Sequence, residues 1–112
     1  MKSKIIDFDQ TKVLELSGKI TIGEGDVKLR QLVADVLESG SRQIVLDMKN
    51  VKYVDSSGIG ELVSSYTTIT NRGGQMRLCR LNSKIYGLLQ LTALVTVFQI
   101  YDSIEDAVQS FT

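Results

Sequence analysis

The sequence predicts an α/β domain in which a mixed, mostly parallel sheet packs with about four helices. Two observations support this fold class. Short runs of β-branched and aliphatic residues alternate along the chain with segments of helical periodicity, which is typical of parallel strands joined by helices. The first two runs are separated only by Asp9 and Gln10, so we expect an antiparallel hairpin at the sheet edge. The predicted order of elements is β-β-α-β-α-β-α-β-α.

The N-terminal half supplies this hairpin and the first helix. Residues 4–8 and 11–18 are predicted strands, because apolar and polar residues partly alternate in the second run. The glycines that follow, up to residue 25, indicate an irregular loop. A helix is expected from Asp26 to Ser39, and Gly40 can adopt the left-handed conformation that ends a helix. The residues predicted to face the core from this helix are Leu29, Leu32, Val33, Val36 and Leu37.

The C-terminal half continues the alternation of strands and helices. Apolar runs predict strands at residues 43–48, 75–81 and about 96–100. Helical stripes predict one helix that ends near Asn71, a second from Lys84 to about Leu91, and a third that begins near Ile104. Asn82-Ser83 can cap the second helix, and Asp102-Ser103-Ile104-Glu105 has the pattern of a capping box for the third.

Length and charge restrict the class of protein. A chain of 112 residues corresponds to one domain, which we place at residues 1–112. Thirteen basic and 13 acidic residues cancel, so no excess of positive charge favours nucleic acid as a partner. No apolar stretch approaches the roughly 20 residues that span a bilayer, and the N-terminus lacks the apolar region of a signal peptide. We therefore expect a cytoplasmic protein without membrane insertion.

The scarcity of reactive side chains argues against catalysis. The chain has no His and one Cys, Cys79, which lies in a predicted strand and is expected to be a small core residue. A lone Cys cannot form an internal disulfide, which fits a reducing compartment. Without His there is no Ser–His or Cys–His pair and no ordinary catalytic zinc site. We therefore expect no catalytic residue, no cofactor and no metal ion.

Residues 54–60 lie between a predicted strand and a long predicted helix. Asp55, Ser56 and Ser57 are placed at the helix N-terminus, where Asp and Ser side chains can accept hydrogen bonds from free N–H groups. Gly58 and Gly60 each cost about 0.8–1 kcal/mol in a helix interior relative to Ala, so something is expected to come near this backbone. These residues leave two interpretations open, a helix cap and an exposed serine placed for modification.

The hexapeptide Asp55-Ser56-Ser57-Gly58-Ile59-Gly60, after a strand ending at Tyr53-Val54, resembles the phosphorylation motif of anti-sigma factor antagonists, the bacterial STAS domains. The segment Gly73-Gly74-Gln75-Met76-Arg77-Leu78 also fits the short return of this family into its next strand. The resemblance covers nearly the whole chain. In one loop, however, Lys19 and Thr21 replace the two acids of the family's frequent Gly-Glu-Leu-Asp, so no role of that loop toward nucleotide or kinase is carried over.

The resemblance implies an anti-sigma factor antagonist that is not an enzyme. Ser56, directly after the Asp, is the implied phosphate acceptor, with Ser57 as the runner-up. The unmodified protein would bind an anti-sigma factor that is itself a serine kinase using ATP and Mg²⁺. Phosphorylation would switch binding off, and a phosphoserine phosphatase would reverse it. We expect a monomer or a weak dimer. The expected partner-binding residues are Asp55, Ser56, Ser57, Gly58, Gly60, Glu61 and Ser64.

The long helix after this motif has a polar outer face in projection at 100° per residue. This face is either an interface or a plain surface, and it comprises Ser57, Glu61, Ser64, Thr68 and Asn71. The residues projected inward are Ile59, Leu62, Val63, Tyr66, Ile69 and Thr70.

Two other functions compete with the antagonist. One is a STAS subunit or scaffold of a transport or signalling complex that is never phosphorylated and uses the same face as a permanent contact. The other is an enzyme, with Ser56 as nucleophile or with the glycines cradling a substrate phosphate. Asp47 and Asp55 are the only nearby carboxylates, and neither offers a base of suitable pKa.

Overall fold

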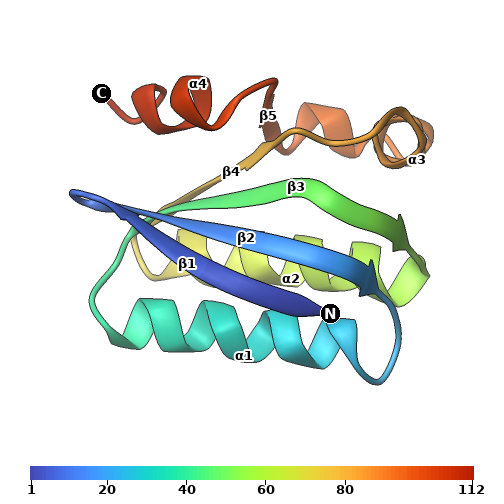
Figure 1. Ribbon diagram of the computed structural model, residues 1–112, viewed down its shortest axis with the longest axis horizontal. Coiled ribbons are helices and arrows are strands. Elements are labelled where there is room, and N and C mark those ends of the chain that lie inside the picture. Colours follow the sequence, from blue (N-terminus) through green and yellow to red (C-terminus); the bar gives the residue numbers. More distant parts are fainter.

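A computed structural model describes residues 1–112 and contains one five-stranded sheet with the strand order β1-β2-β3-β4-β5 (Figure 1). β1 pairs with β2 in antiparallel orientation, and every other neighbouring pair is parallel. The mixed sheet and the order of strands and helices confirm the predicted fold class. The strands are β1 (Lys2–Phe8), β2 (Thr11–Ile20), β3 (Gln43–Val54), β4 (Gln75–Cys79) and β5 (Gln99–Tyr101).

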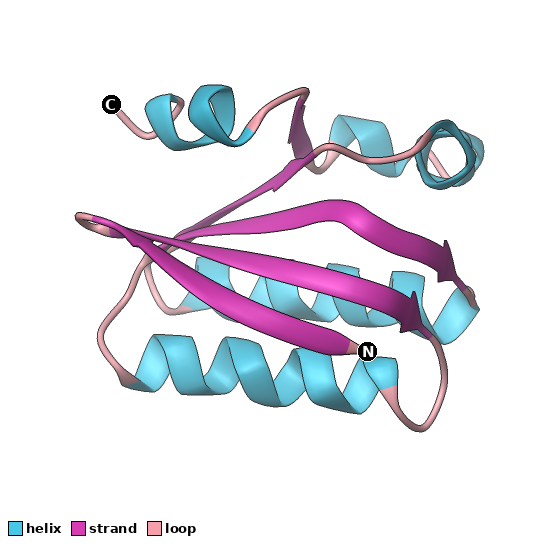
Figure 2. Ribbon diagram, viewed as in Figure 1, coloured by secondary structure: helices cyan, strands magenta, loops and turns pink.

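The helices lie on both sides of the sheet (Figure 2). α1 (Gly25–Glu38) and α2 (Ser56–Asn71) cover one face and enclose a core of 19 buried residues. α3 (Ser83–Leu91) adds Ile85 and Leu89 to this core and is followed by the short 3-10 turn η1 (Leu94–Thr96). α4 (Ile104–Gln109) covers part of the opposite face. The smaller core beneath α4 consists of Val13, Val45, Cys79 and Ala107.

Several predicted turns and caps are present. Asp9 adopts a positive φ of 55° in the hairpin turn, and Gly40 has a φ of 97° after α1, as expected for a helix stop. The side chain of Asn82 caps α3 by accepting a hydrogen bond from the Ile85 N–H at 2.8 Å. The predicted capping box at α4 is wrong by one residue. Ser103 is the cap, and its hydroxyl accepts from the Asp106 N–H at 3.0 Å.

The predicted strand bounds were less accurate than the order. β3 continues to Val54 instead of ending near residue 48, so almost no loop separates it from α2. The pairing of β2 with β3 is irregular at two places, and in each case β3 contributes one residue more than β2. Such bulges interrupt strict alternation, which is why residues 49–54 lacked a clear strand pattern. β5 is also shorter than predicted, because residues 94–96 form η1.

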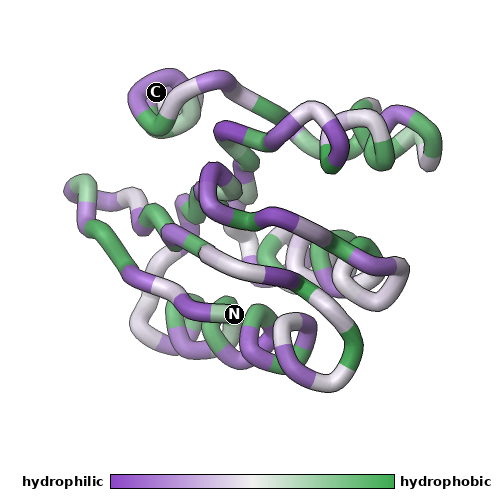
Figure 3. Tube along the Cα trace, turned by 45° about the vertical axis from the view of Figure 1, so that its right-hand side comes forward, coloured by the Kyte–Doolittle hydropathy of each residue, from purple (hydrophilic) through white to green (hydrophobic).

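Hydrophobic and hydrophilic residues are interleaved along the whole chain (Figure 3). None of the helices combines the length and the apolar character that crossing a bilayer requires.

Candidate functional site

Asp55 forms the junction between β3 and α2. Its Oδ1 accepts a hydrogen bond from the Gly58 N–H at 2.8 Å, so Asp55 is the N-cap of α2. Its Oδ2 accepts from the Ile22 N–H at 3.0 Å, which ties the loop after β2 to the same carboxylate. These bonds from Ile22 and Gly58 stabilise the ionised form and hold the pKa of Asp55 below its ordinary value. The cap interpretation is therefore confirmed for Asp55.

The two serines differ in their exposure. Ser56, the first residue of α2, is exposed, whereas Ser57 is half-buried. Neither hydroxyl forms a hydrogen bond within the chain, since the capping role is performed by Asp55. The Ser56 hydroxyl is thus open to another molecule and is not needed to hold the fold together.

Gly58 and Gly60 have different surroundings. A Cβ atom at Gly58 would lie 2.1 Å from the carbonyl oxygen of Ile20, so α2 approaches the end of β2 as closely as only glycine permits. Gly25 does the same for α1, where a Cβ would lie 2.4 Å from the carbonyl oxygen of Lys19. The expected close approach at Gly58 therefore comes from the chain's own strand. A Cβ at Gly60 would have no neighbouring atom within 4 Å.

Glu61 is not on the outer face, contrary to the prediction. Its side chain is 5% exposed and lies between α2 and α1. The carboxylate accepts from Arg30 Nε at 3.0 Å and lies 2.9 Å from Arg30 Nη2, while the Ser65 hydroxyl donates to its other oxygen at 3.4 Å. A buried carboxylate requires such partners. Glu61 therefore joins two helices and is not available to a docking protein.

The projection of α2 placed its apolar residues on the core side, as in the structure, but misplaced Glu61 and Thr70. The buried residues of the helix are Gly58, Glu61, Leu62, Ser65 and Ile69. Ile59, Val63 and Tyr66, which were projected inward, are half-buried and pack against the core, whereas Thr70 is exposed.

The predicted partner-binding residues consequently fall into three groups. Gly58 and Glu61 are buried, and Asp55 and Ser57 lie at the rim of the surface. Ser56, Gly60 and Ser64 are exposed at a spacing of four residues, so they follow one line along α2. This line, which we call the small-residue line, carries no charge and no large side chain. Thr68 and Asn71 are exposed beyond it, as predicted.

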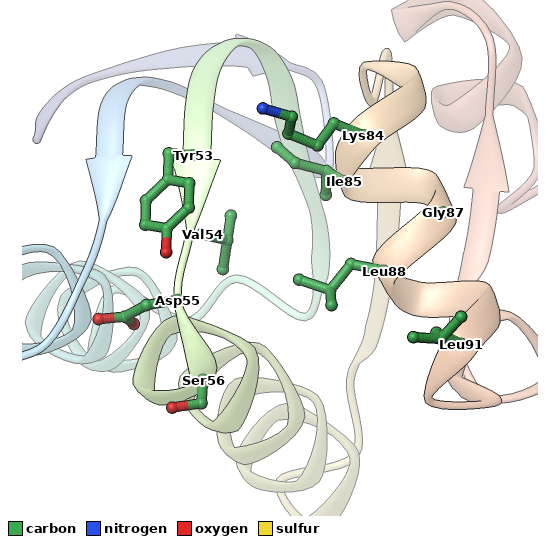
Figure 4. A pocket seen from close by; sticks show the side chains of 9 residues that line it. All are labelled: Tyr53, Val54, Asp55, Ser56, Lys84, Ile85, Gly87, Leu88 and Leu91. Atoms are coloured by element: carbon green, nitrogen blue, oxygen red, sulfur yellow. The ribbon is translucent and has the colours of Figure 1, made fainter.

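A groove of about 500 Å³ lies between the end of β3 and α3, and sequence reasoning did not find it (Figure 4). Tyr53, Asp55 and Ser56 form one wall, and α3 forms the other. Tyr53 is 48% exposed and Leu91 is 88% exposed. The only sequence signal was two large apolar residues at the ends of elements, and such residues are common on protein surfaces.

Comparison with known proteins connects this geometry with a family. The STAS domain family matches residues 4–107. This chain belongs to the STAS domain family. The anti-sigma F factor antagonist of Paenibacillus polymyxa is 31% identical over 91 residues, which cover 81% of this STAS domain and 78% of that protein. The family resemblance stated from the sequence is thereby confirmed.

Solved structures agree with this assignment. A protein from Thermotoga maritima with a known crystal structure is 27% identical in sequence to this STAS domain. The two structures match with a TM-score of 0.85, and the match covers 97% of this chain and 92% of that one. The Bacillus cell fate determinant SpoIIAA, solved in its phosphorylated form, is 16% identical with a TM-score of 0.75 and covers 99% of this chain and 100% of that one. At this identity the likeness to SpoIIAA is one of fold.

Other reactive groups of the STAS domain have structural partners. Asp47 is only 2% exposed, and the Arg80 guanidinium binds its two oxygens at 3.0 and 2.6 Å. Cys79 is a core residue, as predicted, and burial together with the charge of Asp47 raises the pKa of its thiol to about 12. No three His, Cys, Asp or Glu residues converge as metal ligands. Asp47 therefore does not provide the free carboxylate that an enzyme at Ser56 would need.

The loop that departs from the family pattern lies beside the motif. Lys19 is exposed, and the Thr21 carbonyl accepts a hydrogen bond from the Asp26 N–H at 3.1 Å at the start of α1.

Proposed function

We propose that this STAS domain is an anti-sigma factor antagonist regulated by phosphorylation of Ser56. In its unmodified form it binds an anti-sigma factor that is also a serine kinase, and the bound sigma factor is released. The kinase phosphorylates Ser56, the complex separates, and a phosphoserine phosphatase restores the unmodified form. The domain supplies the acceptor and the docking surface and performs no chemistry itself.

The observation that carries this proposal is the exposed Ser56 hydroxyl, which has no hydrogen-bond partner at the first position of α2. A phosphate at that position brings about −1.5 to −2 charges at pH 7. The helix N-terminus favours negative charge through its free N–H groups and its dipole. The domain therefore tolerates the phosphate, and local unfolding is a weak explanation of the switch.

Exclusion of the partner is the stronger explanation. Ser56 lies at the start of the small-residue line of Ser56, Gly60 and Ser64, which allows another protein to approach α2 closely. A hydrated dianion at one end of this line leaves no room for such an approach, and burying it without a cationic partner is costly. Ser57 is the less suitable acceptor, because it is half-buried whereas Ser56 is exposed.

The test uses the kinase that co-purifies with the wild-type domain. Isothermal titration should show binding of the wild type and of Ser56→Ala, and no measurable binding of Ser56→Asp. The kinase with ATP and Mg²⁺ should add one phosphate to the wild type and to Ser57→Ala, as measured by intact mass, and none to Ser56→Ala. Equal affinity of the wild type and Ser56→Asp contradicts the proposal. A transport ATPase as the stable partner, without phosphate transfer, supports the unphosphorylated subunit or scaffold instead.

A further inference from the structure

Three exposed lysines lie in the groove between β3 and α3 or next to Tyr53 at its edge. Lys19 is the pairing partner of Tyr53 in the neighbouring strand, Lys52 precedes Tyr53, and Lys84 lines the groove from α3. None of the three forms an ion pair; the ion pairs of the chain involve other residues. We call Lys19, Lys52 and Lys84 the lysine border.

One acid offsets part of the charge of the lysine border. The one carboxylate that lines the groove belongs to Asp55, and both of its oxygens accept backbone hydrogen bonds. The chain as a whole is neutral, so the balancing acids lie on other elements. They include Asp35 and Glu38 in α1 and Glu105 and Asp106 in α4. Three lysines against the one ionised carboxylate of Asp55 leave the groove and its edge positive on a neutral protein, and a positive region attracts partners of opposite charge.

The groove also offers apolar surface. Tyr53 is about half exposed and Leu91 is largely exposed at the edges of the groove, and Leu88 lies between them (Figure 4). Exposed apolar surface surrounded by polar residues commonly marks a protein interaction site. A volume of about 500 Å³ accommodates one or two apolar side chains of a partner.

We infer that the groove receives an apolar side chain of the anti-sigma factor, and that acidic residues beside this side chain lie against the lysine border. This inference rests on the proposed function, and it specifies the chemistry of the partner's contact segment. Complementary charge across an interface accelerates association and selects the partner, while a buried apolar anchor supplies much of the affinity.

An acidic contact segment on the partner gives a second reason why a phosphate on Ser56 opposes docking. Ser56 lines the same groove as Lys84, at the opposite end (Figure 4). A phosphate on Ser56 places negative charge beside the acidic contact segment of the partner. Like charges in one partly desolvated groove repel, so phosphorylation acts on the partner's acids as well as on the space above the small-residue line.

The charge pattern favours an acidic protein over nucleic acid or a membrane. The positive charges near the groove come from Lys, whereas Arg is the residue suited to bidentate phosphate recognition. Tyr53 is the only aromatic residue in the groove, so stacking along a single strand has one platform. Membrane binding through lipid-facing residues needs a longer apolar face than this groove provides.

The experiment measures affinity for the co-purifying anti-sigma factor by titration at low and at high salt. Lys84→Glu and Lys52→Glu should each weaken binding by about tenfold, and their effect should shrink at high salt. Arg72→Glu makes the same charge change at the far end of α2 and should leave the affinity unchanged. Leu91→Ala should weaken binding by about tenfold at both salt concentrations, since it removes apolar contact. Thermal unfolding of each variant confirms that the fold is intact.

The outcomes separate the inference from the proposed function. If Ser56→Asp abolishes binding while the Lys52, Lys84 and Leu91 variants bind like the wild type, the inference is overturned and the proposed function stands. If no anti-sigma factor binds the wild type, both fail. Binding of the wild type to vesicles of phosphatidylglycerol or to single-stranded RNA, lost in Lys84→Glu while affinity for the anti-sigma factor is kept, also overturns the inference.

Discussion

A single methyl group added to α2 should have opposite effects at two neighbouring glycines. Gly58 and Gly60 both lie in the first turns of the helix and neither has a positive φ, so Ala is compatible with both backbones. They differ in what the new Cβ meets. At Gly58 it would lie 2.1 Å from the Ile20 carbonyl oxygen and 2.7 Å from Val54 Cγ1, whereas at Gly60 it would meet nothing within 4 Å.

The magnitudes follow from these surroundings. Gly60→Ala gains helix propensity and should raise the free energy of unfolding by about 0.8–1 kcal/mol. With an unfolding entropy of about 2.1 cal/mol/K per residue, this gain raises the Tm of a 112-residue domain by about 4 °C. Gly58→Ala pushes the start of α2 away from the backbone of β2, and such overpacking should cost about 2–3 kcal/mol. The corresponding fall in Tm is about 10 °C.

Thermal unfolding followed by circular dichroism measures both variants under one condition. A Gly58→Ala variant as stable as the wild type would refute the close approach of α2 to the Ile20 carbonyl. A destabilised Gly60→Ala would refute the open surroundings of that position. Under the proposed function, Gly60→Ala has a second effect, because the added methyl group lies on the small-residue line. It should weaken anti-sigma factor binding while stabilising the fold, a combination that loss of structure cannot produce.

The other predictions concern buried or capping groups. Asp55→Asn removes a carboxylate whose pKa is lowered in the folded state; the stabilisation by this carboxylate is present above about pH 4 and is lost as the pH falls through the folded pKa. Urea unfolding should therefore show a difference between Asp55→Asn and the wild type near neutral pH that shrinks in acid, and a constant difference would contradict this. Arg30→Ala leaves the Glu61 carboxylate buried without its cation and should cost about 2–3 kcal/mol. Glu61→Ala leaves only Arg30, whose side chain is 62% exposed, and should cost less; the reverse order in denaturant unfolding would speak against the buried pair. Cys79, with its thiol pKa raised to about 12, should resist iodoacetamide at pH 8 in the native protein and react once urea unfolds it, as measured by intact mass.

Hydrophobic periodicity was sufficient to predict the order of elements and the place of the motif. Each helix has a recognisable apolar stripe, and the strands are short apolar runs, so the alternation was visible without knowledge of contacts. Asp55 could also be identified as a cap, because a capping residue acts on the N–H groups of the next turn and needs no distant partner.

Features that depend on contacts between distant residues could not be predicted. Glu61 was placed outside by the projection of α2 at 100° per residue, and nothing in the local pattern indicated that Arg30 would meet it from α1. Gly58 packs on Ile20, 38 positions earlier in the chain, and nothing in the sequence around Gly58 identified this partner. The groove beside Ser56 needs both β3 and α3, and these elements come together only in the folded protein.

The end of β2 supports the starts of both long helices. Gly25 and Gly58 rest against the backbone of Lys19 and Ile20, and the Asp55 N–H donates to the Ile20 carbonyl at 3.3 Å. Because the starts of α1 and α2 are both held against the end of β2, a phosphate added to Ser56 is expected to shift neither helix. Under the proposed function, the anti-sigma factor would then respond to the phosphate on the surface and not to a change in the fold of the domain.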